Sequence, residues 1–292
     1  MSDSYLITGG TGSFGSAIVR ALLNAKRPER IVVFSRDEHK QFLMRNALPD
    51  DPRLRWFLGD VRDRSRLRRA FEGVRYVVHA AAMKHVSAAE YNPGEALRTN
   101  CDGTQNVIEA ALDAGVQRSL LISTDKAVNP SSLYGATKLV AERLFLAAPA
   151  LAGSRECQFS VLRCGNLIGS RGSVVPYWRS LVARGTTYLP VTSPQATRYW
   201  LDEAGAVHAV LRALHGPYAA LTVPEMRAFR VGDLAEAFGM PMRLIGLRPG
   251  EKLHEERGDG RDSSSAPRLT VAELRKLLEQ HGFGGTAPDE AR

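Results

Sequence analysis

The sequence predicts an α/β protein with a Rossmann-type, doubly wound parallel sheet and a smaller C-terminal substrate-binding domain. The first observation is a short β-rich run, Tyr5–Thr8, that ends in glycines at positions 9, 12 and 15 and is followed by an amphipathic helix pattern. Strand, glycine turn and helix in this order are typical of a dinucleotide-binding domain. The second observation is that strand-like runs keep alternating with helix-like patterns, which favours right-handed βαβ units.

The following elements repeat this alternation. Further strands are expected at Arg30–Phe34, Leu54–Leu58, Tyr76–Ala80, Ser119–Ile122 and Phe159–Leu162. A long helix is expected over Pro93–Ala114 and a terminal helix over Val271–His281. We expect residues 1–166 to form the cofactor-binding domain, with returning segments from the C-terminal half, and residues 167–292 to be mainly substrate-binding. The polar segment Asp259–Pro267 has the composition of a flexible linker.

Composition excludes several classes of protein. The chain has 292 residues, of which 44% are hydrophobic and 24% charged, and these values are ordinary for a soluble globular protein. No apolar run approaches the ~18–20 residues of a membrane span. The first residues lack the zones of a signal peptide, so we expect a cytoplasmic protein without a membrane partner. Cys101, Cys157 and Cys164 lack metal-ligand spacing and are expected to be free thiols, so no metal is predicted.

The net charge of +8 has two interpretations. It could mark a nucleic-acid surface, but no recognised nucleic-acid module is present, and the arginines of Arg62–Arg69 are better explained as the solvated face of a short helix. A positive field would also attract an anionic cofactor and an anionic sugar nucleotide. We therefore expect a small anionic ligand and no nucleic acid.

The end of the second expected strand bears on the choice of cofactor. Chains that bind NAD tend to carry an acidic residue here, whereas an arginine suits a 2′-phosphate. Ser35 and Arg36 therefore indicate NADP, with Lys40 as an additional cation. Asp37 is expected to point away or to pair with Arg36. The alternative is that Arg36 is only a surface arginine at a strand end.

The chemistry is concentrated in the run Ser123–Lys138. Tyr134 and Lys138 have i, i+4 spacing and share one face of a helix, so the ammonium can favour the phenolate and make the tyrosine a base for an alcohol proton. Such a pair also occurs by chance on helix surfaces. Its position after a strand that ends in Thr124, Asp125 and Lys126 is what gives it weight, because open α/β sheets bind ligands at that edge.

Together these motifs resemble the extended short-chain dehydrogenase/reductases, and more narrowly the inverting UDP-N-acetylglucosamine 4,6-dehydratases of the pseudaminic acid type. The resemblance covers about residues 4–280 and includes Thr197–Trp200 and Arg248–Glu255 in the substrate domain. It implies NADP as cofactor, a UDP-sugar as substrate and a homo-oligomer. Retaining relatives are usually longer, membrane-attached and carry methionine where this chain has Tyr134, so the resemblance favours inversion at C5.

The resemblance also assigns binding residues. The cofactor residues are Gly9, Thr11, Gly12, Ser13, Phe14, Gly15, Ser35, Arg36, Lys40, Asp60, Val61, Ala80, Ala81, Ala82, Asn100, Tyr134 and Lys138. The substrate residues are Met83, Lys84, Asn166, Ser173, Val174, Arg198, Arg248 and Glu251. Arg198 and Arg248 are the diphosphate candidates, because guanidinium matches paired phosphate oxygens; a surface salt bridge is the alternative for either. His79 is expected to be a hydrogen-bonded core residue, and His85 has no obvious role.

The mechanism implied by the resemblance begins when Tyr134 takes the O4 proton while hydride leaves C4, with Thr124 bonded near O4. The ketone acidifies the C5 proton, and Asp125 and Lys126 provide the two proton transfers that eliminate water, before hydride returns to C6. Alternatively, Lys126 only forms a structural ion pair with Asp125. Rival functions are a 4-epimerase, a C5-retaining dehydratase, a 4-reductase and a non-catalytic NADP-sensing or RNA-binding relative.

Overall fold

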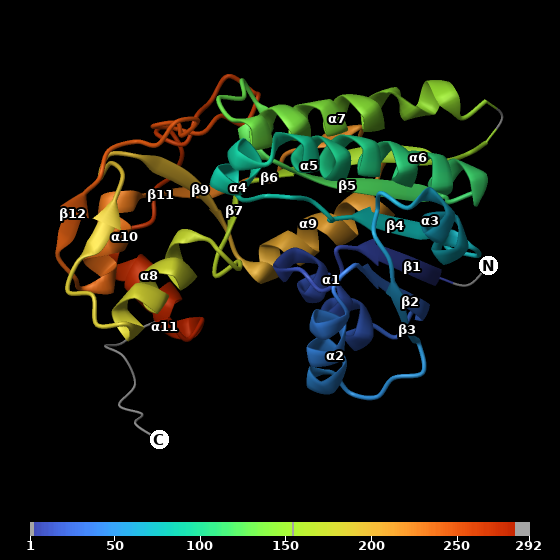
Figure 1. Ribbon diagram of the computed structural model, residues 1–292, viewed down its shortest axis with the longest axis horizontal. Helices are drawn as coiled ribbons and strands as arrows, with labels where there is room; N and C mark the ends of the chain where they lie inside the picture. Colours follow the sequence, from blue (N-terminus) through green and yellow to red (C-terminus); the bar gives the residue numbers. More distant parts are fainter. Residues whose placement is uncertain (1–2, 154, 284–292) are drawn as a thin grey trace. The chain divides into compact units, whose positions relative to one another are not determined.

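The computed structural model describes residues 3–153 and 155–283 and divides the chain into two compact units (Figure 1). The first unit comprises Met1–Cys164 and Glu203–Pro224, and the second comprises Gly165–Asp202 and Glu225–Arg292. The segment that returns to the first unit is therefore Glu203–Pro224. None of the helices in the described ranges has both the length and the apolar composition needed to cross a membrane.

The first unit is built on a seven-stranded parallel sheet with the order β10-β6-β5-β4-β1-β2-β3. Its strands are β1 (Asp3–Thr8), β2 (Pro28–Ser35), β3 (Leu54–Leu58), β4 (Tyr76–His79), β5 (Arg118–Thr124), β6 (Gln158–Cys164) and β10 (Leu221–Thr222). The order reverses between β1 and β4, which is where a doubly wound sheet places its ligand crevice. The predicted fold class is thus confirmed.

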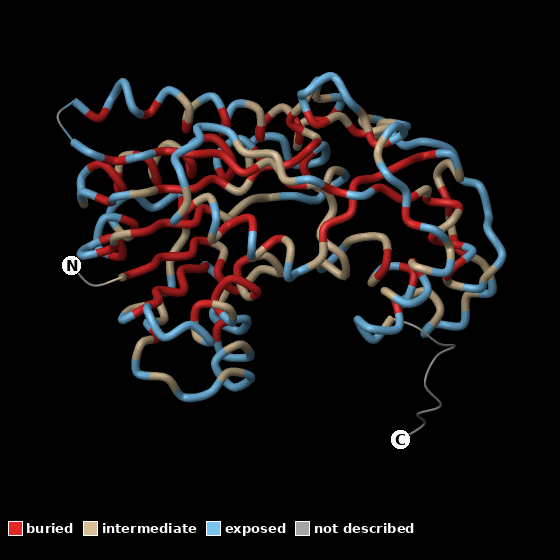
Figure 2. The backbone as a smooth tube through the Cα atoms, turned by 180° about the vertical axis from the view of Figure 1, so that it is seen from behind, coloured by how far each residue is buried: buried red, intermediate tan, exposed pale blue. Residues whose placement is uncertain are grey.

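Helices cover both faces of this sheet (Figure 1). They are α1 (Ser13–Asn24), α2 (Glu38–Ala47), α3 (Arg64–Phe71), α4 (Val86–Tyr91), α5 (Pro93–Leu97), α6 (Gly103–Asp113), α7 (Leu133–Leu151) and α9 (Glu203–His215). One apolar core lies between the sheet and α3, α6 and α7 and includes Phe34, Phe71 and Phe145. The strands β1, β2, β4, β5 and β6 are buried along most of their length (Figure 2), so their apolar runs, rather than an alternating pattern, reflect burial on both faces.

The expected helix Pro93–Ala114 is not a regular α-helix throughout. Between α5 and α6 lies a π-helical turn, η1 (Arg98–Asp102), and it contains Asn100. A π-helical turn accommodates one extra residue and changes the direction of the side chains that follow. This irregularity places Asn100 in the interior, where it is 1% exposed.

The second unit has its own core. It contains a three-stranded sheet of order β11-β9-β7 and a two-stranded sheet of β12 and β8. Its elements are β7 (Asn166–Leu167), α8 (Val174–Ala183), β8 (Leu189–Val191), β9 (Thr197–Leu201), β11 (Arg227–Arg230), α10 (Val231–Phe238), β12 (Met242–Leu244) and α11 (Val271–Gln280). Trp178, Trp200, Phe229 and Leu274 are among the residues of the core.

The segment 259–267 differs from the flexible linker that its composition suggests. Ser263 is 0% exposed, and its hydroxyl lies 2.6 Å from Thr197 Oγ1. The same hydroxyl accepts a hydrogen bond from the backbone N–H of Glu255. A buried hydroxyl is normally hydrogen-bonded, and the hydrogen bonds of Ser263 hold the segment 259–267 against β9. The segment is therefore ordered around Ser263.

Candidate active site

The glycines at positions 9, 12 and 15 in the turn after β1 have no room for a Cβ atom. Gly9 adopts a left-handed conformation with φ of 64°, and a Cβ atom there would lie 2.8 Å from the Cα atom of Ala81. A Cβ on Gly15 would overlap the carbonyl oxygen of Gly9. Gly12 occupies the N-cap position of α1 and has no side chain that could cover the N-terminus of this helix, where a pyrophosphate is favoured. The predicted residues of this turn therefore fit a dinucleotide.

Two basic residues, Arg36 and Lys40, follow β2, and the nearby carboxylates already make hydrogen bonds or ion pairs within the protein. Ser35 is buried and its hydroxyl accepts from Gln41 Nε2, whereas Arg36 is exposed and lies 3.7 Å from Asp60. Asp37 caps α2 by accepting from the N–H of Lys40, and its second oxygen lies 2.6 Å from Lys40 Nζ. Of the two alternatives expected for Asp37, pairing with Arg36 is wrong: the carboxylate is directed to the N-terminus of α2 and to Lys40.

The loop after β3 places Asp60 and Val61 at the same sheet edge. Asp60 accepts from both the backbone N–H and the guanidinium of Arg62. Burial opposes ionisation of Asp60, but these hydrogen bonds outweigh it and lower the pKa of the carboxyl. Val61 is 5% exposed and contacts Gly103, where a Cβ would lie 2.6 Å from Val61 Cγ2. Val61 therefore packs closely against the first residue of α6.

A hydrogen-bonded arch follows β4. The amide of Asn100 accepts from the N–H of Met83 at 2.8 Å and donates to the carbonyl of Met83 at 2.9 Å. It also donates to Thr137 Oγ1 on α7. Since the chain from Ala80 to Ala82 has only methyl side chains, the arch can lie close to a bound ligand. Lys84, just beyond it, is exposed.

His79 is a core residue, as predicted. Its ring nitrogens lie 2.7 Å from Thr8 Oγ1 and 3.1 Å from Thr104 Oγ1, and the ring stacks on Phe145. Burial, with a smaller contribution from the charge of Lys138, lowers the pKa of His79 to about 3. The imidazole is therefore neutral at physiological pH.

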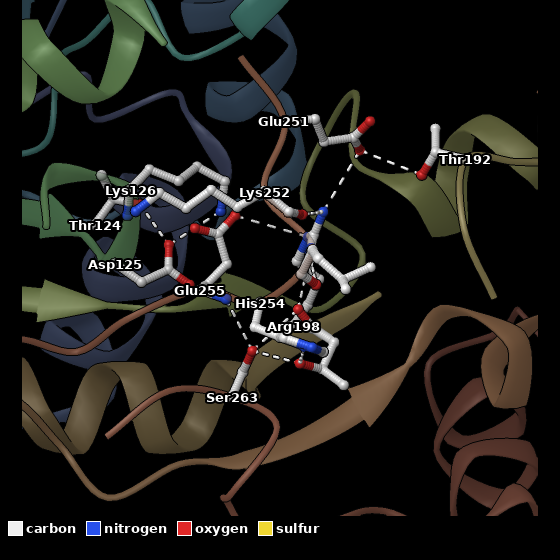
Figure 3. A network of polar contacts seen from close by, with 12 residues as sticks. Thr124, Asp125, Lys126, Thr192, Arg198, Glu251, Lys252, His254, Glu255 and Ser263 are labelled. Carbon is white, nitrogen blue, oxygen red and sulfur yellow. Dashed lines mark hydrogen bonds and ion pairs between the residues drawn. The ribbon is translucent and has the colours of Figure 1, made fainter. Parts of the chain in front are cut away.

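Thr124, Asp125 and Lys126 lie where β5 ends, in the turn η2 (Asp125–Ala127) (Figure 3). The hydroxyl of Thr124 donates to Asp125 Oδ1 at 3.0 Å, and Lys126 Nζ donates to the same oxygen at 3.0 Å. Asp125 is 1% exposed, whereas the side chain of Lys126 is 23% exposed. A buried carboxylate thus links the two other groups that the sequence selected.

The first turn of α7 packs directly on this acid–base turn. Ser132 caps α7 by accepting from the N–H of Gly135. A Cβ atom on Gly135 would overlap the carbonyl oxygen of Lys126, so the two backbones are in contact. Glycine at this position brings Tyr134, its neighbour in the chain, next to η2. The structure therefore brings the two halves of the predicted catalytic run together.

Lys138 lies one helical turn further along α7 and is 3% exposed. Its ammonium donates to the carbonyl of Ile122 at 2.8 Å. Burial lowers the pKa of Lys138 to about 8, and the negative charge of Glu142 partly offsets this effect. Lys138 is thus a buried cation whose charge near physiological pH depends on the groups around it.

In the second unit, Arg198 serves the protein backbone. Its guanidinium donates to the carbonyl oxygens of Thr197, Lys252 and Leu253, and it is 7% exposed (Figure 3). This arrangement favours a role in shaping the loop 248–255 over direct contact with a diphosphate. Glu251 belongs to the same arrangement, because it accepts from the N–H of Arg248 and lies 3.5 Å from Arg198.

The other predicted substrate residues of this unit occupy different elements. Arg248 is exposed. Asn166 lies in β7, whereas Ser173 and Val174 lie at the N-terminus of α8. Ser173 occupies the N-cap position, and its side chain makes no cap hydrogen bond.

Sequence reasoning did not identify Glu142, Ser123 and Arg163. Ser123 Oγ donates to Glu142 Oε1 at 2.6 Å, and Arg163 donates to both carboxylate oxygens, at 3.1 and 2.6 Å. A signal was available: Glu142 is a charged residue in the apolar part of α7, four residues after Lys138 and eight after Tyr134. That spacing places all three on one helix face.

Comparison with known proteins agrees with this geometry. A model of the polysaccharide biosynthesis protein family matches residues 5–272. An inverting UDP-N-acetylglucosamine 4,6-dehydratase from Campylobacter jejuni is 47% identical over 257 residues, which cover 86% of this chain and 76% of the relative. A UDP-glucose 4-epimerase from Rickettsia rickettsii is 38% identical over 265 residues, which cover 87% and 77%.

A solved structure, that of Pen from Bacillus thuringiensis, superposes with a TM-score of 0.89 at 33% identity and covers 96% of this chain and 98% of that one. The match of the family model extends over nearly the whole described chain. The chain therefore belongs to the polysaccharide biosynthesis protein family, on the fold of the extended short-chain dehydrogenase/reductases.

Proposed function

We propose that the chain is a nucleotide-sugar 4,6-dehydratase that converts UDP-N-acetylglucosamine to a UDP-2-acetamido-2,6-dideoxy-4-hexulose with inversion at C5. The observation that carries this proposal is the contact between Gly135 and the backbone of Lys126, which sets a base for O4 beside an acid–base pair. Hydride chemistry at C4 needs only the first of these groups. Loss of water needs both a proton acceptor at C5 and a proton donor at O6.

A nicotinamide dinucleotide fits the residues of the first unit. We propose that Gly9, Thr11, Gly12, Ser13, Phe14 and Gly15 hold the pyrophosphate, and that Asp60 and Val61 line the adenine. The alanines 80–82 and Asn100 would border the nicotinamide half. A bound nicotinamide would supply hydride transfer, for oxidation at C4 of the sugar and reduction at C6.

The chain's own residues then move the protons. Tyr134 removes the O4 proton, Lys138 stabilises the phenolate, and Thr124 donates a hydrogen bond near O4. The C4 ketone makes the C5 hydrogen acidic. When the proton that the two groups share lies on Asp125, Lys126 is a neutral amine and takes the C5 proton, and Asp125 gives its proton to the departing C6 hydroxyl. Because Lys126 and Asp125 share a hydrogen bond of 3.0 Å, a proton can pass between them.

We further propose that the dinucleotide is NADP(H). Three features at the end of β2 support this choice. Arg36 is exposed and available to a 2′-phosphate, and Ser35 replaces the acidic residue expected for NAD. The nearest carboxylate along the chain, Asp37, is engaged at the N-terminus of α2. Lys40 would add a second cation once a phosphate competes with Asp37.

For the substrate, we propose that Met83 and Lys84 in the first unit lie against the sugar and the phosphates. In the second unit, Arg248 is the stronger candidate for the diphosphate, since Arg198 already donates to three backbone carbonyls. Asn166, Ser173, Val174 and Glu251 remain proposed substrate residues from the resemblance. Inversion is supported by Tyr134 and by the similarity to the inverting enzyme of Campylobacter jejuni.

The similarity to a UDP-glucose 4-epimerase makes epimerisation the second candidate. Mass spectrometry separates the two, because dehydration lowers the mass of UDP-N-acetylglucosamine by one water, whereas epimerisation leaves it unchanged. The same reaction in deuterium oxide should place deuterium at C5, and the proton couplings of the reduced product should report an inverted centre. An isomeric product without loss of water would overturn the proposal, and a C5 centre of the original configuration would overturn inversion alone.

A further inference from the structure

A buried carboxylate lies behind the proposed catalytic pair. Glu142 is 2% exposed and shares a face of α7 with Lys138 and Tyr134. The steps proposed above do not use it. A carboxylate this deeply buried is costly unless it is compensated, so its presence requires an explanation.

Glu142 joins three elements. It accepts from Ser123 at the end of β5 and from Arg163 at the end of β6, and these two residues are direct partners in the parallel sheet. Ser123 immediately precedes Thr124. The hydrogen bonds of Glu142 therefore fix α7 against the strand end that carries Thr124, Asp125 and Lys126.

Stability alone is a weak explanation for this ion pair. Replacing a buried pair by apolar side chains of similar size is often neutral or stabilising, because desolvation offsets the attraction. The pair has well-formed hydrogen bonds, with 2.6 Å between Arg163 Nη2 and Glu142 Oε2. Its geometry is thus suited to holding one carboxylate, in its ionised form, at one place.

The charges around Lys138 explain why the position of the Glu142 carboxylate is important. Lys138 interacts electrostatically with His79 on β4, Cys101 on η1 and Glu142 on its own helix. The imidazole of His79 is neutral at physiological pH, and burial raises the pKa of the Cys101 thiol, which keeps it neutral as well. Glu142 therefore provides the negative charge that opposes the loss of the Lys138 proton.

We propose that Glu142 is a positioning residue: locked by Ser123 and Arg163, its carboxylate keeps Lys138 an ammonium and holds α7 in place over the end of β5. Tyr134 then has a cation beside it at the pH where the enzyme works. This inference rests on the proposed function in assigning the reaction to Tyr134 and Lys138. The state of Lys138 itself can be measured without turnover.

The test is an NMR titration of the purified chain carrying lysine labelled with ¹³C at Cε. The resonance that disappears in Lys138→Met identifies Lys138. In the wild type it should titrate near pH 8, and Glu142→Gln should lower this midpoint by about one pH unit, the lower end of the effect of a nearby opposite charge. Glu142→Asp should keep a midpoint close to that of the wild type, because the charge is retained.

A matched control separates charge from stability. Phe145→Leu lies one turn further along α7 in the apolar core, so it should lower stability while leaving the Lys138 midpoint unchanged. If Glu142→Gln fails to fold because Arg163 is left unpaired, the double variant Glu142→Gln/Arg163→Gln removes both charges and should still lower the midpoint. An unchanged midpoint in the folded variant would overturn the inference.

Turnover provides the second readout. The alkaline limb of the pH–rate profile should move to lower pH in Glu142→Gln and stay in place in Phe145→Leu. A wild-type chain that forms no dehydrated product overturns the proposed function, whereas a normal Lys138 midpoint in Glu142→Gln overturns only the role of Glu142. The two failures are therefore distinguishable.

Discussion

Asn100 holds both backbone groups of Met83, accepting from its N–H at 2.8 Å and donating to its carbonyl at 2.9 Å. The π-helical turn η1 gives Asn100 this direction. Asn100→Ala should leave both groups of Met83 without this partner and lower the free energy of unfolding by about 1–3 kcal/mol. Urea titration measures the loss. Gln105→Ala, on the neighbouring α6, is the control and should stay close to the wild type; equal stability of both variants would show that the arch does not depend on Asn100.

Gly135 determines how closely α7 approaches the acid–base turn. Gly135→Ala should push the two backbones apart and lower the free energy of unfolding by about 1–3 kcal/mol. The variant should also lose activity at a temperature at which it remains folded. Gly94→Ala is the matched control, because a methyl group at Gly94 in α5 would meet no atom within 4 Å. Thermal unfolding and product formation check the pair. Similar behaviour of the two variants would contradict the packing argument.

The roles proposed for Asp125 and Lys126 predict a selective defect. Lys126→Ala and Asp125→Asn should slow the loss of water by about 10²–10⁴. Oxidation at C4 should persist, and it can be followed as reduced cofactor with a 6-deoxy analogue of the substrate, which has no hydroxyl to lose. Lys276→Ala on α11 removes an exposed lysine and serves as the control. Wild-type dehydration by either variant would make that residue structural.

Cofactor choice should depend on Arg36. Arg36→Ala should weaken NADP⁺ binding by roughly 10-fold or more, the effect of losing a hydrogen bond to a charged group, and change NAD⁺ binding little. Calorimetric titration of both cofactors measures this. Arg69→Ala removes a 71%-exposed arginine from α3 and controls for net charge. Equal affinity of the wild type for both cofactors would refute the preference.

His79 should make stability depend on pH. Its pKa is about 3 in the folded chain against an ordinary 6.5, so between these values the unfolded chain binds the additional proton. Stability from this group therefore falls as pH falls through that window, by up to about 1.4 kcal/mol per pH unit. Relative to His79→Gln, the wild type should lose more stability between about pH 7 and about pH 5. The exposed His39→Gln should leave the wild-type dependence intact, and a parallel curve for His79→Gln would contradict the burial argument.

Local sequence patterns were sufficient to predict the strands of the sheet. They were not sufficient for features that depend on contacts with residues far away in the sequence. The strand Leu54–Leu58 was predicted with its observed bounds because the run LRWFL lies between Pro52-Arg53 and Gly59-Asp60, which end the strand-like pattern. The π-helical turn was not predicted, since Asn100 reaches Met83 only through tertiary structure. The sequence left two directions open for Asp37, because a carboxylate at this position can either cap the following helix or pair with Arg36.

The candidate site shows the same limit. Sequence spacing predicted that Tyr134 and Lys138 share one face of a helix. The resemblance to a known family made Arg198 a candidate ligand for the diphosphate. It could not show that the guanidinium of Arg198 donates to backbone carbonyls, because two of the three acceptors, Lys252 and Leu253, lie more than fifty positions away in the chain. The burial of Ser263 could not be predicted for a similar reason. A serine in a polar run is expected to be exposed, and only the folded structure shows its contact with Thr197.

The interleaved order of the two units has a consequence for synthesis on the ribosome. β6 is complete when Cys164 has been made, but its outer partner, β10, follows only at Leu221–Thr222, after the whole of Gly165–Asp202. During that interval the outer edge of β6 has no strand to pair with. Its unpaired backbone N–H and C=O groups can then form hydrogen bonds with a strand of another chain. A nascent chain stalled between these points should therefore recruit chaperones, and a fragment that ends after Cys164 should aggregate.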